Sequence, residues 1–183
     1  MRPSQRTAVL DAALRLLDRE GGAEISYDAT AREAGLTKAG VMYHFATREE
    51  LVLGVVGHAA RRCVAAMRAV AGGGPEGLSP AERTRAYVEV AVGGDLSTAD
   101  VSVFADALYR PHHAGPWREV FAPWFDLSDC PDPDLRARLC AARLAADGLW
   151  LARATGLFAP GADGQPGMDD VVAEVRRLLE PAP

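Results

Sequence analysis

The chain has 183 residues, 49% of them apolar, so it can bury an ordinary core in one domain or in a small domain followed by a larger one. No run of 18 apolar residues occurs, which excludes a typical transmembrane helix. A formal net charge of −5 argues against a protein that coats nucleic acid in general, because nonspecific affinity comes from neutralising phosphates. It does not exclude a localised reader of DNA.

The N-terminal third of the chain shows the spacing of short amphipathic helices. Leu10, Ala13 and Leu17 recur with a helical period, and the glycines at 21–22 are expected to end this first helix. A second helix begins at Ser26 or Asp28, either of which can cap it.

The segment 34–45 is the most informative part of the sequence. It contains the only lysine, Lys38, in a chain with 19 arginines. Gly35 supplies a turn, and Thr37 can cap a third helix over residues 37–45. The spacing places Val41 and Phe45 on the buried side of this helix, and its exposed side carries small, basic and hydrogen-bonding residues: Lys38, Gly40, Tyr43 and His44. A helix-turn-helix reader of DNA requires this combination.

Residues 5–53 resemble the tetracycline-repressor (TetR) family of bacterial transcription regulators. Segments 12–17, 28–34, 37–45 and 48–51 match the family's first four helices at the right mutual spacing. Two departures are Met42, where many members have a tyrosine, and Thr30, which replaces an aliphatic residue; Tyr43 can supply the aromatic hydroxyl in place of Met42. The resemblance implies that DNA is contacted by seven residues: Thr37, Lys38, Ala39, Gly40, Tyr43, His44 and Arg48.

The rest of the chain is also predicted to be helical. A capping box at 47–50 opens a long helix that runs to about Ala71, where the glycine-rich segment 72–77 breaks it. Pro80 stands at the first position of the next helix. Further helices are expected over 83–92, 98–108, 117–127 (kinked at Pro123), 134–155 and 168–180, with a loop at 111–116.

Small residues dominate the helix predicted over 134–155. Such side chains allow close helix packing, so we expect a two-fold interface there, with bulk from Val171, Val172, Val175, Leu178 and Leu179 of the last helix. Residues 146–151 also look like the second-to-last helix of the TetR family, which commonly forms the dimer's four-helix bundle. The sequence therefore predicts a homodimer.

Aromatic residues gather in the middle of the chain, as in a lined apolar cavity. Asp147 is a carboxylate on an Ala/Leu-rich helical face, and it needs a partner such as Arg143, Arg153, another chain or a cationic ligand. His58 is expected to face the same cavity from the long helix. We predict an effector site of seven residues: Arg62, Met67, Phe104, Trp117, Phe121, Asp147 and Trp150.

The sequence gives weaker signals for a metal site and for redox-active cysteines. The candidate ligands for a metal ion are His112 and His113 with Asp106 or Asp129, and His58 as a third imidazole. Adjacent histidines in a Pro/Gly loop rarely converge on one ion, so neither metal nor cofactor is expected. The three cysteines lack metal-ligand spacing and are interpreted as buried or idle thiols, with a redox sensor as the alternative.

These patterns together predict an all-α protein. Residues 1–47 form a helix-turn-helix DNA-binding domain, and residues 48–183 form a helical domain for effector binding and dimerisation. The resemblance implies a non-enzymatic repressor that binds a double-stranded operator and is released by a small apolar molecule. Residues 1–6 lack a secretory signal, so a cytoplasmic protein is expected, without a membrane partner. The alternatives are a helical enzyme, for example one using Asp147 with His58, and a partner-binding dimer that does not read DNA.

Overall fold

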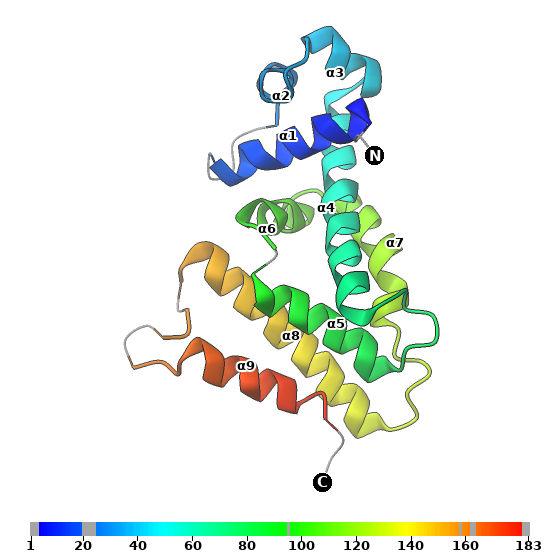
Figure 1. The fold of residues 1–183 in the computed structure, drawn as a ribbon, viewed down its shortest axis with the longest axis vertical. Helices are drawn as coiled ribbons and strands as arrows, with labels where there is room; N and C mark the ends of the chain where they lie inside the picture. Colours follow the sequence, from blue (N-terminus) through cyan, green and yellow to red (C-terminus); the bar gives the residue numbers. More distant parts are fainter. Residues whose placement is uncertain (1–3, 20–24, 95, 158, 162–163, 181–183) are drawn as a thin grey trace. The chain divides into compact units, whose positions relative to one another are not determined.

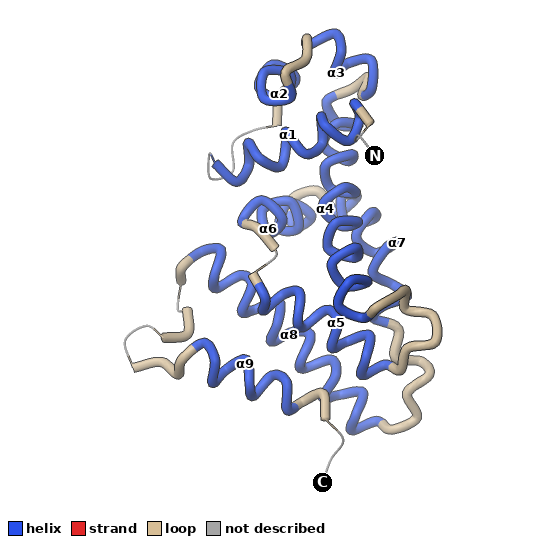
Figure 2. The backbone as a smooth tube through the Cα atoms, in the orientation of Figure 1, coloured by secondary structure: helices blue, strands red, loops and turns tan. Residues whose placement is uncertain are grey.

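The computed structural model describes residues 4–19, 25–94, 96–157, 159–161 and 164–180, and these residues form helices and loops without a strand (Figure 2). This confirms the predicted all-α class. None of the helices in the described ranges is long and apolar enough to cross a membrane. The elements (Figure 1) are α1 Gln5–Arg19, α2 Tyr27–Ala34, α3 Lys38–His44, α4 Arg48–Ala71, α5 Pro80–Gly93, α6 Thr98–Ala105, the 3₁₀ turns η1 Asp106–Leu108 and η2 Pro111–His113, α7 Ala114–Phe125, α8 Pro133–Thr155 and α9 Met168–Arg177.

Contacts between residues divide the chain into two compact units. Unit 1 comprises Met1–Arg62 and Ser97–Glu119, and unit 2 comprises Cys63–Leu96 and Val120–Pro183. Helices α4 and α7 each begin in unit 1 and end in unit 2. The division describes packing, and the functional boundary after residue 47 stays a prediction.

In unit 1, α1 packs against α2, α3 and α6. Its apolar face is buried as the helical period predicts: Val9, Leu10, Ala13, Leu14 and Leu17. Near its C-terminal end, the Asp18 carboxylate accepts the backbone N–H of Ala99 at 2.8 Å, in the first turn of α6. Ser26, rather than Asp28, caps α2. The predicted end of the first helix at 21–22 lies outside the described residues.

The residue that follows α3, Phe45, is fixed from three directions. Its ring is buried against α4 at Gly54, where an added Cβ would lie 2.7 Å from Phe45 Cε1 and 3.2 Å from Leu10 Cδ2. The Tyr27 hydroxyl donates to the Phe45 carbonyl at 2.8 Å, and the guanidinium of Arg6 lies 4.8 Å from the ring centre. The end of α3 is thereby held against α1, α2 and α4.

The start of α4 differs in one detail from the predicted capping box. Thr47 accepts the N–H of Glu50 at 3.1 Å, as predicted. The Glu50 carboxylate, however, accepts the N–H of Ala46 at 2.9 Å instead of that of Thr47. The hydrogen bond accepted by Glu50 therefore comes from Ala46, one residue before the expected donor Thr47. It ties the α3–α4 connection to the first turn of α4.

Unit 2 is built on the packing of α5 against α8, with α9 in contact with both (Figure 1). The buried side chains of α9, Val172 and Val175, face this intrachain core. Both side chains are buried within one chain, and the predicted part of α9 in a two-fold interface stays a prediction. Helix α8 ends at Gly156, whose left-handed φ of 67° suits glycine. Helix α9 ends at Arg177, earlier than predicted, and turns follow.

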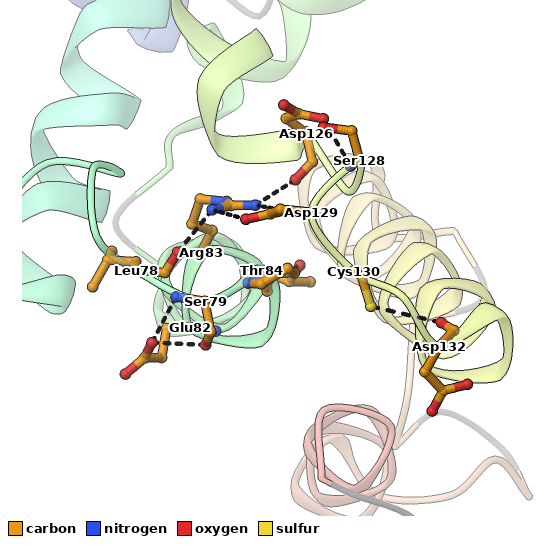
Figure 3. Close-up of polar contacts among 11 residues, drawn as sticks. Leu78, Ser79, Glu82, Arg83, Thr84, Asp126, Ser128, Asp129, Cys130 and Asp132 are labelled. Atoms are coloured by element: carbon orange, nitrogen blue, oxygen red, sulfur yellow. Dashed lines mark hydrogen bonds and ion pairs between the residues drawn. The ribbon is translucent and has the colours of Figure 1, made fainter.

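A buried arginine joins the start of α5 to the α7–α8 connection (Figure 3). Arg83 donates to both carboxylate oxygens of Asp129, at 2.6 and 3.1 Å, and to the carbonyls of Leu78 and Asp126 at 2.7 Å each. The contact lowers the pKa of the Asp129 carboxyl. Because a buried guanidinium is costly when unpaired, this bidentate pair fixes the connection. Asp129, one of the alternatives for a metal ligand, is thus paired with Arg83.

The predicted loop at 111–116 is wrong, because η2 and the first turn of α7 occupy it. Gly115 and Pro116 were expected to break a helix, but they lie in its first turn. Backbone N–H groups there have no intrahelical acceptor, so proline costs no hydrogen bond. The helix predicted over 98–108 ends at Ala105 and continues as η1.

Substitution of Gly54 by alanine tests the anchoring of Phe45. Helix propensity alone favours alanine by about 1 kcal/mol, but the added Cβ would lie 2.7 Å from the Phe45 ring, and such overpacking costs about 1–3 kcal/mol. We expect Gly54→Ala to lower the free energy of unfolding in urea. Gly57→Ala is the matched control on α4, because its Cβ meets the flexible end of Arg61. Equal stabilisation by both substitutions would contradict the anchor.

Candidate DNA-binding helix and effector site

Helix α3 is capped and packed as the sequence predicts. Thr37 accepts the N–H of Gly40 at 3.0 Å. Val41 and Phe45 are buried, which confirms the predicted inner face. A Cβ on Gly40 would lie 3.3 Å from the Thr37 hydroxyl oxygen, so the glycine also leaves space for the cap. The helix is thus held by its apolar side and its N-terminus.

The other side of α3 is available to a partner. Lys38, Ala39 and Tyr43 are exposed, and Tyr43 is 86% exposed despite its large ring. His44 is half-buried, with its ring edge-on to Tyr43 at 5.2 Å between centres. Thr37 is exposed and Gly40 half-buried, so six of the predicted DNA contacts lie on or beside one short helix.

Two of the predicted phosphate and base contacts have partners within the chain. The Lys38 ammonium pairs with Asp28 at 2.9 Å, and both side chains are exposed. Exposed pairs of this kind contribute about 0–1 kcal/mol, so Lys38 can exchange Asp28 for another anion at little cost. Arg48 donates through Nε to the carbonyl of Ile25 at 2.9 Å and thereby crosses to the start of α2.

Three predicted effector residues lie in unit 1. Phe104 and Trp117 meet edge-to-face at 5.3 Å between ring centres, and Arg62 approaches Asp100 at 4.0 Å. His58 was expected to face the effector cavity, but its Nε2 contacts Asp11 of α1 at 2.7 Å. That placement also removes the suggested pairing of His58 with Asp147.

Asp147 is the polar centre of the predicted effector residues in unit 2. It accepts a hydrogen bond from the Tyr87 hydroxyl and another from Arg143 at 3.0 Å. Burial raises the pKa of the Asp147 carboxyl, against the opposing effects of Tyr87 and Arg143. Burial likewise raises the pKa of Tyr87, and the charge of Asp147 adds to this shift. The predicted Arg143 partner is present, whereas Arg153 donates to the Val92 carbonyl.

Aromatic rings pack against Tyr87 and Arg143, the two partners of this carboxylate. Tyr87 meets Phe121 at 6.0 Å and Phe125 at 4.9 Å, both edge-to-face, and the Arg143 guanidinium lies 5.3 Å from the Phe125 ring centre. Phe125 and Arg143 also line a pocket of about 360 Å³, together with Thr84, Leu127, Leu139 and Cys140. Met67 and Trp150, the other predicted members in unit 2, are buried.

Tyr87 was missed at the sequence level. It stands in the Ala/Val-rich segment of α5, where a buried phenol needs a hydrogen-bond partner. The sequence contains that requirement, but not the identity of the partner, which lies 60 positions further along. Phe125 and Arg143 were noted in the sequence but not assigned to the site.

A second group of functional side chains forms in unit 1. His112 and His113 were expected to diverge, but the Nε2 atoms of both approach Glu49 Oε1, at 2.6 and 2.8 Å. These contacts lower the pKa of Glu49, the larger effect coming from His113. Asp106 contacts the other ring nitrogen of His113. A pocket of about 350 Å³, lined in part by Arg48, Asp106 and Arg110, lies in the same unit.

Comparison with protein families identifies the class of this molecule. Residues 9–55 match the model of bacterial regulatory proteins of the tetR family, and residues 81–179 match the tetracyclin repressor-like C-terminal domain. The chain belongs to the TetR family. The first match contains α2, α3 and the start of α4, and the second contains most of α5 through α9.

Relatives of this TetR-family chain include regulators of known structure. It is 31% identical over 99 residues to the HTH-type transcriptional regulator BetI of Rhizobium meliloti, a match over 52% of this chain and 45% of that protein, less than half its length. It is similar to a TetR-family member from Streptomyces coelicolor, SCO1917 (26% identity, TM-score 0.62, 98% and 100% of the two chains). The multidrug binding protein EbrR is another similar structure (26% identity, TM-score 0.59, 100% and 98%).

Membership in the TetR family decides between the classes of function. The chain is a transcriptional regulator of the DNA-binding type and not an enzyme. Proteins of this family bind DNA and small-molecule effectors, generally as dimers. Residue roles at α3 and around Asp147 remain predictions.

Proposed function

We propose that this TetR-family chain is a repressor that binds a pseudo-palindromic operator as a homodimer and leaves it when a small, mostly apolar effector binds. The observation that carries the proposal is the two-sided character of α3. One side is buried through Val41 and Phe45, and the other exposes Lys38 and Tyr43. A helix fixed on its inner side and polar on its outer side suits the major groove.

The seven proposed DNA contacts divide by chemistry. Lys38 and Arg48 are cations suited to phosphate or guanine, whereas Tyr43 and His44 offer hydrogen bonds and ring surface. The small residues Ala39 and Gly40 let the backbone approach the groove closely, and Thr37 adds a hydroxyl at the N-terminal end of the helix. The N-terminus of α3 also carries the positive end of the helix dipole, which favours a phosphate nearby.

The proposed dimer contact lies on α8. Its exposed residues repeat with alternating steps of four and three, the pattern of a seam between packed helices: Ala137, Ala141, Leu144, Gly148, Leu151 and Thr155. Leu144 and Leu151 are 54% and 52% exposed within the single chain. Burial of this seam against its two-fold copy would remove these side chains from water. Two α3 helices related by a two-fold axis then require half-sites about 34–36 Å apart.

The proposed effector is an apolar cation bound around Asp147. A partly buried carboxylate beside Tyr87, Phe121 and Phe125 supplies both a negative charge and aromatic faces, the two features that bind an organic cation. The similar protein EbrR has been crystallised with malachite green and with ethidium. An entering cation would replace Arg143 on the carboxylate, because Arg143 is half-exposed and able to turn away.

Helix α4 provides a covalent connection between effector and operator sites. It begins directly after α3 and continues without interruption into unit 2, where Met67 is buried. Arg62, Phe104, Trp117 and Trp150 complete the proposed effector-binding set. Release of the operator requires that the effector bind the DNA-incompetent state more tightly than the DNA-competent state. The difference in binding free energy is about 1.4 kcal/mol for each tenfold loss of operator affinity.

Substitution of Lys38 tests DNA reading. Lys38→Ala is expected to weaken operator binding by about 1–3 kcal/mol if a base contact is lost, or to reduce the salt slope by about one if a phosphate contact is lost. Affinity is measured by mobility shift on the chain's own upstream DNA at several salt concentrations. Arg177→Ala removes an exposed cation from α9 and serves as the control. Unchanged affinity at every salt concentration, with the dimer intact, would exclude Lys38 from the interface.

Substitution of Gly148 tests the α8 seam. A Cβ at Gly148 meets no atom within 4 Å in the single chain, so leucine fits the monomer. Across a close two-fold contact the added side chain would overfill the interface, and this overpacking would cost about 1–3 kcal/mol per protomer. We expect Gly148→Leu to shift sedimentation toward monomer and to weaken operator binding together. Ala69→Leu adds an exposed leucine on α4 as the control. A dimer of wild-type strength would place the interface elsewhere.

Neutralisation of Asp147 tests the effector class. Asp147→Asn keeps the side-chain shape but removes the charge, so binding of ethidium, measured by fluorescence, should weaken by about 2 kcal/mol, or roughly thirtyfold. Operator affinity without ligand should be unchanged. Asp134→Asn neutralises an exposed carboxylate at the start of the same helix and is expected to behave as wild type. If both variants bind ethidium equally well, Asp147 does not hold the cation.

A further inference from the structure

The cluster at Glu49, His112 and His113 is built differently from a surface ion pair. The three ligand atoms, Glu49 Oε1 and the two histidine Nε2 atoms, lie within 4.8 Å of one another. Both imidazoles share one carboxylate oxygen, at 2.6 and 2.8 Å. The residues come from the first turn of α4 and from η2, all in unit 1. Within the described ranges, this is the one group with such ligand geometry.

The two ring nitrogens of His113 both face carboxylates, and this arrangement favours a cation beside the ring. The His113 side chain is fully buried, and each of its ring nitrogens faces a carboxylate: Nδ1 contacts Asp106, and Nε2 contacts Glu49. A neutral imidazole has one N–H and one lone pair, and an ionised carboxylate only accepts. One of the two contacts of a neutral ring would therefore set lone pair against lone pair. Either a second proton or a metal ion must resolve that conflict.

The neighbouring charges favour a cation at the Glu49 side of the ring. Asp106 is already neutralised, because its other oxygen pairs with Arg110. Its contact with Nδ1 fixes the tautomer that leaves the Nε2 lone pair directed at Glu49. A carboxylate that orients the far nitrogen of a liganding imidazole is a common arrangement around zinc. His112 brings a second imidazole nitrogen to the same Glu49 oxygen, so two nitrogens and one oxygen converge on one point.

We propose that Glu49, His112 and His113 bind a divalent transition-metal ion, with zinc as the best fit, and that Asp106 orients His113. Two imidazole nitrogens and one carboxylate oxygen form a ligand set for zinc that leaves a fourth position open. Tetrahedral bonds of about 2.0–2.2 Å require ligand atoms roughly 3.3 Å apart, so Glu49 Oε1 must move slightly away from both histidine nitrogens, which now lie at 2.6 and 2.8 Å. Glu49 and His112 are exposed and can make that adjustment around the buried His113.

The proposed ion would join α4 to η2 within the unit that carries α3. Glu49 lies in the turn that follows the α3–α4 connection, where Glu50 accepts the N–H of Ala46. Metal binding is therefore expected to stabilise the folded unit, because the ligands converge only in the folded chain. This site is separate from the effector residues around Asp147, and it does not depend on the repressor function proposed above.

The test uses the full chain, freed of metal with a chelator, and Zn²⁺ or Co²⁺ as the probe. Calorimetry should give one Zn²⁺ per chain, the melting temperature should rise with Zn²⁺, and Co²⁺ should give the visible absorption of a four-coordinate site. His112→Ala removes an exposed ligand and Glu49→Gln a charged one, and each should lower affinity by more than a hundredfold. Asp106→Asn should lower it by about 10–100-fold, as for other orienting groups. His58→Ala, which removes the histidine that contacts Asp11, is the control and should bind as wild type.

Several results would overturn the proposal. Equal Zn²⁺ affinity in wild type, His112→Ala and Glu49→Gln would place the ion elsewhere, for example on a cysteine, since all three cysteines remain in every variant. A melting temperature that does not change with Zn²⁺, together with no visible absorption from Co²⁺, would leave the cluster as an ion-paired group without a metal site. None of these measurements involves DNA, so failure of the metal site and failure of operator binding are distinguishable.

Discussion

The contact between Phe45 and Gly54 is the constraint on which the DNA-reading part of the molecule depends. Helix α3 is too short to be stable alone, so its direction must come from packing. The missing side chain at Gly54 lets the Phe45 ring reach α4, and the Tyr27 hydroxyl and Arg6 guanidinium fix the same residue from other sides. Lys38 and Tyr43 remain exposed because everything that holds α3 acts on its opposite side. Rigid positioning of this kind is what a reader of base edges needs.

Buried or partly buried charges determine the chemistry of the two units. In unit 2, the two terminal nitrogens of Arg83 donate to Asp129 and to two backbone carbonyls, so this side chain serves the fold. Asp147 differs, because burial raises its pKa even with Tyr87 and Arg143 beside it. A carboxylate that is paired but incompletely compensated can gain from a cationic ligand. In unit 1, two carboxylates face the one buried ring of His113, so negative charge is in excess around that imidazole. The ligands that we propose for the two sites therefore differ: an organic cation for Asp147 and a metal ion for the Glu49 cluster.

The single chain also leaves apolar surface with a regular pattern on α8. Leu144 and Leu151 stand in line with small residues at heptad spacing, while Val172 and Val175 of α9 are buried within the chain. Isolated exposed leucines are ordinary, but a seam of this length and period is not. Family membership and this seam agree on the assembly that we propose, because a two-fold copy would present the same small residues to each other.

The sequence by itself determined most of the helices, the Thr37 cap and the buried side of α3, because helical period and capping are local properties read from neighbours. It did not predict the helical turns at 111–116. It also determined the family, since matched segments at fixed spacing are more specific than any one residue. Only the tertiary structure decided the partners of the charged groups: Tyr87 for Asp147, Asp11 for His58 and Glu49 for both adjacent histidines. These partners lie between 47 and 64 positions apart in the chain. No local pattern encodes such contacts, because they exist only after distant helices have packed.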